Sequence, residues 1–394
     1  MTQRLPDAAW TRRADLAGLV AALGAGNARY VGGAVRDTLL GLAVTDIDLA
    51  TPLTPDAVIA RADAAGIRTV PTGIAHGTLT AVLPGGPVEI TTLRCDLSTD
   101  GRHAEVAFQG DWHADAARRD FTINALYADP ESHEITDYFG GLDDLAARRL
   151  RFIGDAHARI REDHLRILRY FRFQAGFGSL PADREAEAAC AALAPMLKAL
   201  SRERIASEIL KLLGLPDPAP TVARMAALAV LDVILPEADP APLAALIAHE
   251  HSEHAAPDAL RRLGAMLPAD PVLVDQVAAR LRLANAAKKR LAAIAARPRA
   301  GEEQEARALA YRLGAEAARD RLLIAGRSLA PLAGWTAPRF PLKGGDVVAA
   351  GIRAGPMVAH ILQGVEARWI AEGFPPEARV RTLFEAALAG AGKG

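Results

Sequence analysis

The sequence predicts an α+β protein, with an N-terminal head built on a mixed β-sheet flanked by helices and an all-α remainder. Between residues 28 and 93, short runs rich in β-branched residues alternate with helical stretches and Gly or Pro punctuation. From about Asp155 onward, long Ala- and Leu-rich helical segments broken by Pro take over, and strand alternation disappears. The sheet is therefore expected in the first part of the chain.

Five short runs carry the strand prediction, and they are Ala28–Val31, Ile47–Ala50, Arg68–Pro71, Leu79–Pro84 and Val88–Thr92. The last two flank Pro84-Gly85-Gly86-Pro87, which supplies turn chemistry between two apolar segments. We therefore expect these two runs to form a hairpin.

With 394 residues, the chain is too long for an ordinary single domain. Pro-rich joints at 216–220 and 331–345 divide the helical part. The resulting expectation is four parts: a head at 1–153, a helical neck at 154–215, a helical body at 216–330 and a helical tail at 331–394.

Composition excludes several classes of protein. No uncharged apolar run reaches membrane-spanning length, and the first twenty residues lack a basic-then-apolar export signal. Only two cysteines occur, Cys95 and Cys190, which cannot by themselves form a zinc site. We expect a cytoplasmic protein with no membrane contact, and we predict no protein partner.

The net charge of the chain is only −1, so any nucleic-acid contact must be local. Arginines are concentrated in residues 148–172, which could provide such a contact.

A glycine pair stands between the first predicted strand and a helix, in Tyr30-Val31-Gly32-Gly33-Ala34-Val35-Arg36-Asp37. Backbone N–H groups at Gly33 can approach a phosphate closely, and Arg36 adds a cation where a triphosphate would lie. A Gly-Gly pair at a strand end is more often only a turn, and this spacing is neither a Walker loop nor a dinucleotide fingerprint.

Two carboxylates follow, in Asp46-Ile47-Asp48. On a strand they project to one face, because side chains alternate with period two, and together they can hold two Mg²⁺ ions with waters and substrate phosphates. Glu89 is a candidate third carboxylate from the hairpin. Glu89 could equally be an exposed strand residue or a partner of Arg94.

These elements together resemble the class II nucleotidyltransferases, the family of CCA-adding enzymes and bacterial poly(A) polymerases. The resemblance covers roughly residues 28–213. It rests on the glycine segment and the carboxylate pair, and on three later stretches: Arg118-Arg119-Asp120-Phe121-Thr122-Ile123-Asn124-Ala125-Leu126, Gly140-Gly141-Leu142-Asp143-Asp144-Leu145 and Glu162-Asp163-His164-Leu165-Arg166-Ile167-Leu168-Arg169.

Arg119 supplies a cation for triphosphate oxygens, while Asp120 and Asn124 supply polar groups for a ribose hydroxyl. The resemblance implies the same roles. The structural alternative is a segment that only caps a helix.

A helix is expected to start near Glu162, so that residues 162, 166 and 169 share one face. The resemblance implies that Glu162, Asp163 and Arg166 act as a protein template, reading the amino donor and adjacent acceptor that C and A both present. Arg169 and Arg172 would support the template or reach phosphate. A solvated helix with a Glu162–Arg166 pair is the alternative. Ser201-Arg202-Glu203-Arg204 and Glu208 resemble a motif that braces this helix.

The resemblance implies template-independent addition of C, C and A to the 3′ end of tRNA from CTP and ATP. The tail resembles a tRNA-binding segment. Poly(A) polymerase, CC-adding-only and A-adding-only enzymes remain alternatives, as does a non-catalytic RNA-binding protein. The missing arginine-rich segment after the carboxylates argues against poly(A) synthesis, and the intact region from Leu93 to His113 favours full CCA addition.

Overall fold

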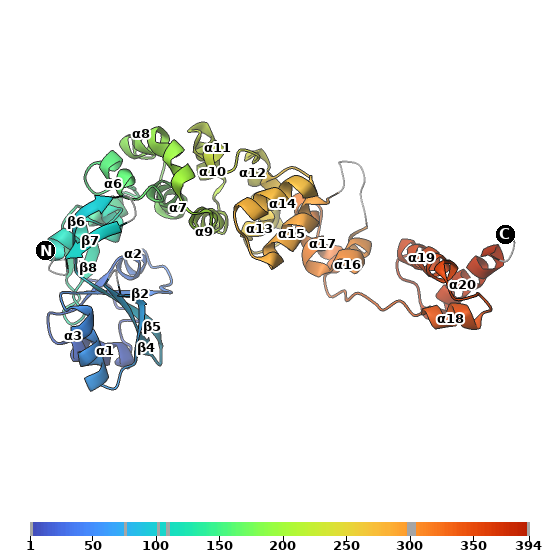
Figure 1. Ribbon diagram of the computed structural model, residues 1–394, viewed down its shortest axis with the longest axis horizontal. Coiled ribbons are helices and arrows are strands. Elements are labelled where there is room, and N and C mark those ends of the chain that lie inside the picture. Colours follow the sequence, from blue (N-terminus) through green and yellow to red (C-terminus); the bar gives the residue numbers. More distant parts are fainter. Residues whose placement is uncertain (1–2, 75–76, 101–102, 108–110, 298–304, 392–394) are drawn as a thin grey trace. The chain divides into compact units, whose positions relative to one another are not determined.

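The computed structural model describes residues 3–74, 77–100, 103–107, 111–297 and 305–391. The chain divides into two compact units, residues 1–236 and 237–394, and each is described by itself (Figure 1). The four-part division expected from the sequence stays a prediction.

A seven-stranded sheet forms the centre of the first unit, with strand order β3-β4-β5-β2-β1-β8-β9. β2 and β5 are parallel, whereas the other neighbours are antiparallel, so the sheet is mixed as expected. The strands are β1 (Arg29–Val31), β2 (Ile47–Thr51), β3 (Thr69–Gly73), β4 (Thr78–Leu83), β5 (Gly86–Thr92), β8 (Leu126–Ala128) and β9 (Ile135–Asp137).

All five strand predictions are confirmed as β1 to β5, and so is the hairpin, in which Leu83 pairs with Gly86. Four strands were not predicted. Both β8 and β9 have only three residues, and all three of β8 are buried, so neither offers a readable alternation. β6 (Cys95–Asp100) and β7 (His103–Ala107) form a separate two-stranded sheet in the region from Leu93 to His113. Residues 101–102 of that region lie outside the described part of the chain.

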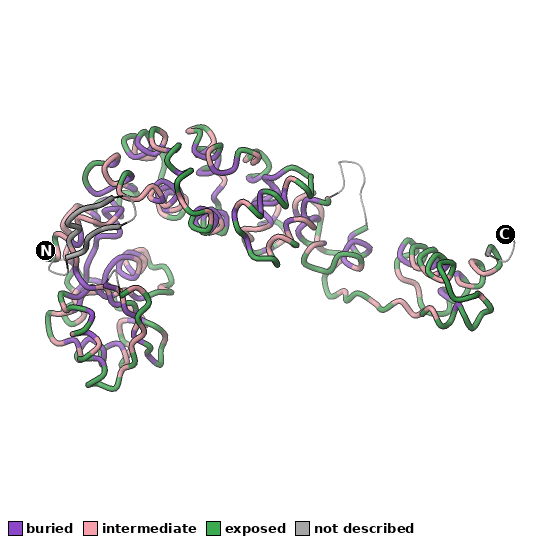
Figure 2. The backbone as a smooth tube through the Cα atoms, viewed as in Figure 1, coloured by how far each residue is buried: buried purple, intermediate pink, exposed green. Residues whose placement is uncertain are grey.

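Helices cover the sheet of the first unit because each presents an apolar face. α2 packs on β1, β2 and β8 through Ala34 and Val35, and α1 packs on α3. In Figure 2 buried residues, in purple, run through strands of the sheet and through α2. The helices are α1 (Ala14–Leu23), α2 (Gly33–Leu39), α3 (Pro55–Ala64), α4 (Trp112–Ala117), the 3₁₀ turn η2 (Thr122–Asn124) and α5 (Gly141–Ala146).

Close packing explains why glycine stands at position 141, in the segment Gly140-Gly141-Leu142-Asp143-Asp144-Leu145. A Cβ on Gly141, the first residue of α5, would collide with the backbone carbonyl of Thr122. The Thr122 hydroxyl also donates to the carboxylate of Asp144, 2.6 Å away, on the same helix. The Gly140-Gly141 pair therefore lets α5 lie directly on η2.

A run of helices completes the first unit. α6 packs on α8, and α7 packs on both α9 and α10. The elements are α6 (Ala156–Glu162), α7 (Arg166–Phe177), α8 (Arg184–Leu193), η3 (Ala194–Ala199), α9 (Arg202–Leu213), α10 (Ala219–Ala227) and α11 (Val230–Ile234).

The expectation of one helix starting near Glu162 is wrong, because α6 ends at Glu162 and α7 begins at Arg166. Asp163 between them is extended, with φ −149° and ψ 105°, so it breaks the first helix. Its Oδ1 accepts from the backbone N–H of Leu165, 3.1 Å away, which closes a turn directly before the second helix. The sequence pattern of period 3.6 runs across this break and conceals it.

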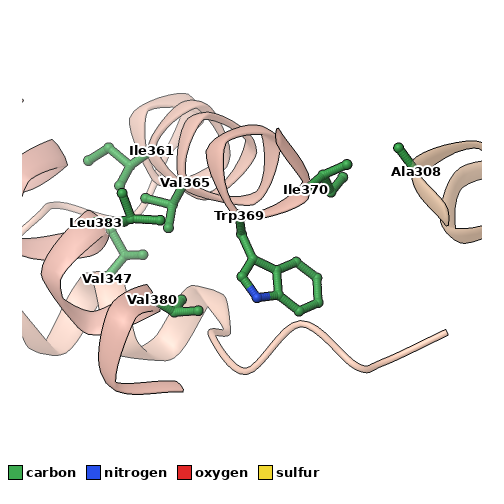
Figure 3. Close-up of a cluster of buried hydrophobic side chains, with 8 residues drawn as sticks. All are labelled: Ala308, Val347, Ile361, Val365, Trp369, Ile370, Val380 and Leu383. Carbon is green, nitrogen blue, oxygen red and sulfur yellow. The ribbon is translucent and has the colours of Figure 1, made fainter. Parts of the chain in front are cut away.

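The second unit is helical, and from residue 154 onward the described residues contain no strand, as predicted. Its elements are α12 (Ala241–Ser252), α13 (Ala259–Met266), α14 (Pro271–Arg280), α15 (Asn285–Ala295), α16 (Ala306–Leu313), α17 (Ala315–Ile324), η4 (Ala330–Leu332), α18 (Gly344–Ala349), α19 (Pro356–Ala371) and α20 (Glu377–Ala391). Trp369 anchors an apolar cluster that joins α18, α19 and α20 (Figure 3). Within the described ranges, no helix is both long and apolar enough to cross a membrane.

Candidate active site

Three carboxylates meet on one face of the sheet. Asp46 directly precedes β2, Asp48 is its second residue, and Glu89 on β5 is the in-register partner of Asp48. Alternation places Asp46 and Asp48 on one face, and residues paired across neighbouring strands project to the same side. Glu89 is exposed, as expected if it were only a surface residue of the strand. It nevertheless lies beside Asp46 and Asp48.

The charges of this group are incompletely balanced. Burial and the neighbouring charge of Glu89 raise the pKa of Asp48 to about 6, and Asp46 adds to the effect while Arg119 opposes it. Burial and Asp46 raise the pKa of Glu89 as well. The site is therefore short of positive charge.

The backbone of Gly32 lies between these carboxylates and Arg119. A Cβ built on Gly32 would stand 3.6 Å from Nη1 of Arg119 and 3.9 Å from Oδ2 of Asp48. Gly32 has φ +70°, a conformation that favours glycine, where β1 turns into α2. Gly33 follows as the first residue of α2. The predicted glycine turn and the carboxylate strand thus adjoin, as the order of the motifs suggested.

Two residues that sequence reasoning missed hold Arg119. Asp115 on α4 accepts from Nη2 of Arg119 at 3.1 Å, and the hydroxyl of Tyr127 on β8 accepts from its Nε at 3.1 Å. Tyr127 in turn donates to Asp115 at 2.6 Å. Burial acts to raise the pKa of Asp115, but the guanidiniums of Arg119 and Arg118 outweigh it, so this pKa is lowered and Asp115 stays ionised. The i, i+4 spacing of Asp115 and Arg119 was a usable signal, whereas Tyr127 gave none.

Arg36, expected to meet a triphosphate, is buried at 7% exposure. Its guanidinium donates to Oδ1 of Asn124 at 2.5 Å and to the carboxylate of Asp37, and it stacks 4.3 Å from the ring centroid of Phe177. It still lowers the pKa of Asp48 through space. A direct phosphate contact by Arg36 would have to displace these partners.

Asp120 and Asn124 continue this buried network. Asn124 donates to Oδ1 of Asp120 at 3.0 Å, and Arg169 on α7 donates through Nε to its Oδ2 at 2.8 Å. Burial acts to raise the pKa of Asp120, yet Arg169 and Asn124 lower it overall. These contacts connect the sheet to α7, and the ribose contact expected of Asp120 and Asn124 stays a prediction.

The three residues expected to read the base lie at the junction of α6 and α7. Arg166 donates to Oε2 of Glu162 at 2.5 Å and to the backbone carbonyls of Arg159 and Arg118, at 2.8 and 2.9 Å. The Glu162–Arg166 pair of the structural alternative is therefore present. Asp163 is more open, with a side chain that is 34% exposed.

α9 braces this junction, as the resemblance of its motif implied. Arg204 donates to Oδ2 of Asp163 at 2.7 Å, and Glu208 accepts from Nε of Arg172 at 2.6 Å. Arg172 is thus paired with an acid of α9. Through this ion pair Arg172 supports the selecting residues only by holding α7 against α9. A phosphate contact by Arg172 stays a prediction.

The carboxylate face suits a hard divalent cation. Within the described part of the chain, no group of three or more His, Cys, Asp or Glu side chains is arranged so that it could hold a metal ion. Mg²⁺ does not require such a group, because it binds one or two carboxylates and takes its other oxygens from water and substrate phosphates. Burial and the charges of Glu89 and Asp46 raise the pKa of Asp48, and a cation at this face would favour its ionised form.

Comparison with known proteins agrees with this geometry. Residues 28–151 match the poly A polymerase head domain, and residues 182–241 match the probable RNA and SrmB-binding site of polymerase A. Over these two segments the chain is similar to poly A polymerases.

The chain is also similar to CCA-adding enzymes over about half of its length. It is 48% identical over 188 residues to the human mitochondrial CCA tRNA nucleotidyltransferase 1, which covers 47% of this chain and 43% of the relative. It is 42% identical over 211 residues to a Streptococcus pyogenes CCA-adding enzyme, covering 52% of this chain and 50% of the relative. The matched segment thus spans about half the length of these curated relatives or less.

Solved structures extend the likeness to the whole chain. The Bacillus stearothermophilus CCA-adding enzyme in complex with CTP is 27% identical, with a TM-score of 0.70, over 96% of this chain and 98% of that one. The Thermotoga maritima CCA-adding enzyme complexed with tRNA is 20% identical, with a TM-score of 0.69, over 93% and 91% of the two chains. The second likeness concerns the fold alone.

Proposed function

We propose that this chain is an enzyme that adds C, C and A to the 3′ end of tRNA from CTP and ATP, releasing pyrophosphate at each step. One observation carries the proposal: Asp48, with its raised pKa, lies beside Glu89 on one side and close to Gly32 and Arg119 on the other. Carboxylates, a glycine backbone and an arginine are the groups that transfer from a triphosphate needs. The likeness to a CCA-adding enzyme that binds CTP supports this choice of substrates.

Asp46 and Asp48 would hold Mg²⁺, with Glu89 next to them. When bound, the cations supply activation of the attacking 3′-hydroxyl and stabilisation of the leaving pyrophosphate. Arg119 would donate to the triphosphate oxygens, because Asp115 and Tyr127 engage its Nε and Nη2 and fix the guanidinium beside Gly32. Asp115 thereby acts as a positioning residue for Arg119.

Asp163 and Arg166 would select the base. A carboxylate accepts from an exocyclic amino group and a guanidinium donates to a ring acceptor, so the pair fits C and A and rejects U and G. The contacts of Arg166 with Arg159, Glu162 and Arg118 use three of its five N–H groups, so a base does not have to displace them. Asp163 is the more accessible of the two, and Arg204 orients it.

The tail would bind tRNA away from the reacting end. Three basic side chains are exposed on or beside α18 and α19: Lys343, Arg353 and Arg368. Their positive charges would attract the phosphates of the tRNA. A cytoplasmic location, expected from the sequence, stays a prediction.

Poly(A) synthesis is the second candidate, favoured by the name of the matching head domain. One assay separates it from CCA addition and from the partial activities. A tRNA that lacks its last three nucleotides is incubated with CTP, ATP or both, and product lengths are measured. Arrest after three added residues supports CCA addition, and long adenylate ladders support poly(A) synthesis. Arrest after CC, growth only on tRNA ending in CC, or no growth would overturn the proposal of full CCA addition.

A further inference from the structure

Arg159 on α6 connects the base-reading junction with the segment that carries Arg119. Its Nη1 donates to the backbone carbonyl of Ala117 at 2.9 Å, and its Nη2 lies 2.5 Å from Oε1 of Glu162. Ala117 is the last residue of α4, so its carbonyl has no partner within that helix. The guanidinium of Arg159 therefore joins the end of α4 to an acid of the junction.

Arg166 makes a second connection to the same segment. Its Nη2 donates to the backbone carbonyl of Arg118 at 2.9 Å, and its Nη1 donates to that of Arg159 at 2.8 Å. Arg118 is the C-cap of α4 and directly precedes Arg119. Two arginines of the junction thus hold successive carbonyls, immediately before the arginine proposed to meet the triphosphate.

Glu162 is shared between Arg159 and Arg166. Its Oε1 pairs with Arg159, and its Oε2 accepts from Nη1 of Arg166 at 2.5 Å. The three side chains are only 15–24% exposed, so water and salt screen these pairs weakly. Charge-assisted hydrogen bonds on both oxygens fix the plane of a carboxylate. Without Arg159, the carboxylate of Glu162 could turn, and Arg166 would lose a fixed acceptor.

We propose that Arg159 is a positioning residue for base selection. It holds Glu162 and the end of α4, so that Arg166 presents its remaining N–H groups to the base in one orientation. The inference rests on the proposed function, because it assigns base reading to Arg166. The alternative is an i, i+3 ion pair that only stabilises α6.

Titration calorimetry with CTP and UTP, on the full chain with Mg²⁺ and without tRNA, separates these roles. In Arg159→Met we expect the affinity for CTP to fall about tenfold and that for UTP to change less than about twofold. The two nucleotides share the ribose and the triphosphate and differ only in the base. Arg119 keeps its own partners, Asp115 and Tyr127, so the triphosphate contacts should persist in the variant.

Arg161→Met is the matched control. Arg161 is exposed on the same helix, two residues further on and about 200° around it, so its loss should leave both affinities unchanged. Arg159→Lys keeps the charge, but its single ammonium lacks the fork that reaches Ala117 and Glu162 together, and we expect a loss of about threefold for CTP. Thermal melting checks folding, and Arg159→Lys carries the test if Arg159→Met does not fold.

Equal weakening of CTP and UTP, or an unchanged preference for CTP in the Arg159 variants, would overturn the inference and assign Arg159 to the stability of α6. A parent that binds CTP and UTP equally would overturn it as well. The addition assay on tRNA lacking its last three nucleotides tests the proposed function separately. A parent that prefers CTP but adds nothing would refute the proposed function, whereas the binding preference of the Arg159 variants would still decide the positioning role.

Discussion

The carboxylate face of the sheet and the α6–α7 junction are both built from acids and arginines. On the sheet the acids outnumber the arginines, whereas at the junction acids and arginines are paired. On the sheet, Arg119 and Arg36 offset only part of the effect of burial, Glu89 and Asp46 on Asp48, and the pKa values of Asp48 and Glu89 are raised. At the junction, each acid has an arginine of its own. The pairs are Glu162–Arg166, Asp163–Arg204, Asp120–Arg169 and Glu208–Arg172.

This difference indicates how each region meets its ligand. A cluster of like charges is stabilised by an added cation, so the proposed metal binding would stabilise the sheet face. The charges of the junction are already paired, so a base would be recognised there through the donors and acceptors that these pairs leave open, which would make the junction selective. The following predictions test this contrast, from the largest expected effect to the smallest.

Replacing Asp48 by Asn should have the largest effect. The change keeps the side-chain shape but removes the charge that would hold Mg²⁺, so we expect nucleotide addition to fall at least about 1,000-fold. Single-turnover rates with CTP measure the loss, and gel-shift titration should give a tRNA affinity close to that of the parent. A variant within tenfold of the parent rate would remove Asp48 from the metal site.

Asp163→Ala should change selection more than rate. Loss of a charged acceptor is worth about 1.5–3 kcal/mol, so discrimination of C and A against U and G should drop by about 10- to 100-fold. Competition between CTP and UTP on one tRNA measures it. Unchanged discrimination would assign Asp163 to the helix break alone.

Arg204→Ala should give a weaker form of the same effect, about threefold to tenfold in discrimination. The ion pair with Asp163 is about half exposed on the arginine side, so it orients the carboxylate with a small free energy. Arg202→Ala, two residues earlier on α9, is the control and should have no effect on selection. Equal effects of the two changes would argue against a specific role of Arg204.

Asp48→Asn should also alter stability, in a pH-dependent way. The pKa of Asp48 is about 6 in the folded chain against an ordinary 3.8, so folding favours the protonated form and the parent loses stability as pH rises between about 4 and 6. The variant lacks this loss, so its Tm should exceed that of the metal-free parent at pH 8 and equal it near pH 3.5. Mg²⁺ should raise the Tm of the parent more than that of the variant. A higher Tm of the metal-free parent at pH 8 would contradict the charge imbalance.

Local patterns predicted much of this protein. The five strands β1 to β5, their hairpin and the change to helices were readable because alternation and turn residues are encoded over a few neighbouring positions. The shared face of Asp46 and Asp48 follows from strand geometry alone. The same local logic could not find β8 and β9, whose three residues give no period.

The sequence by itself thus determined the fold class and the residue types of the candidate site. Only the tertiary structure decided which of those residues meet. It set Glu89 against Asp48 through strand register, held Arg119 with Asp115 and Tyr127, and buried Arg36 against Asn124. The physical reason is that charge pairing and burial depend on partners far apart in the chain, whereas a propensity or a motif reports only on its immediate neighbours.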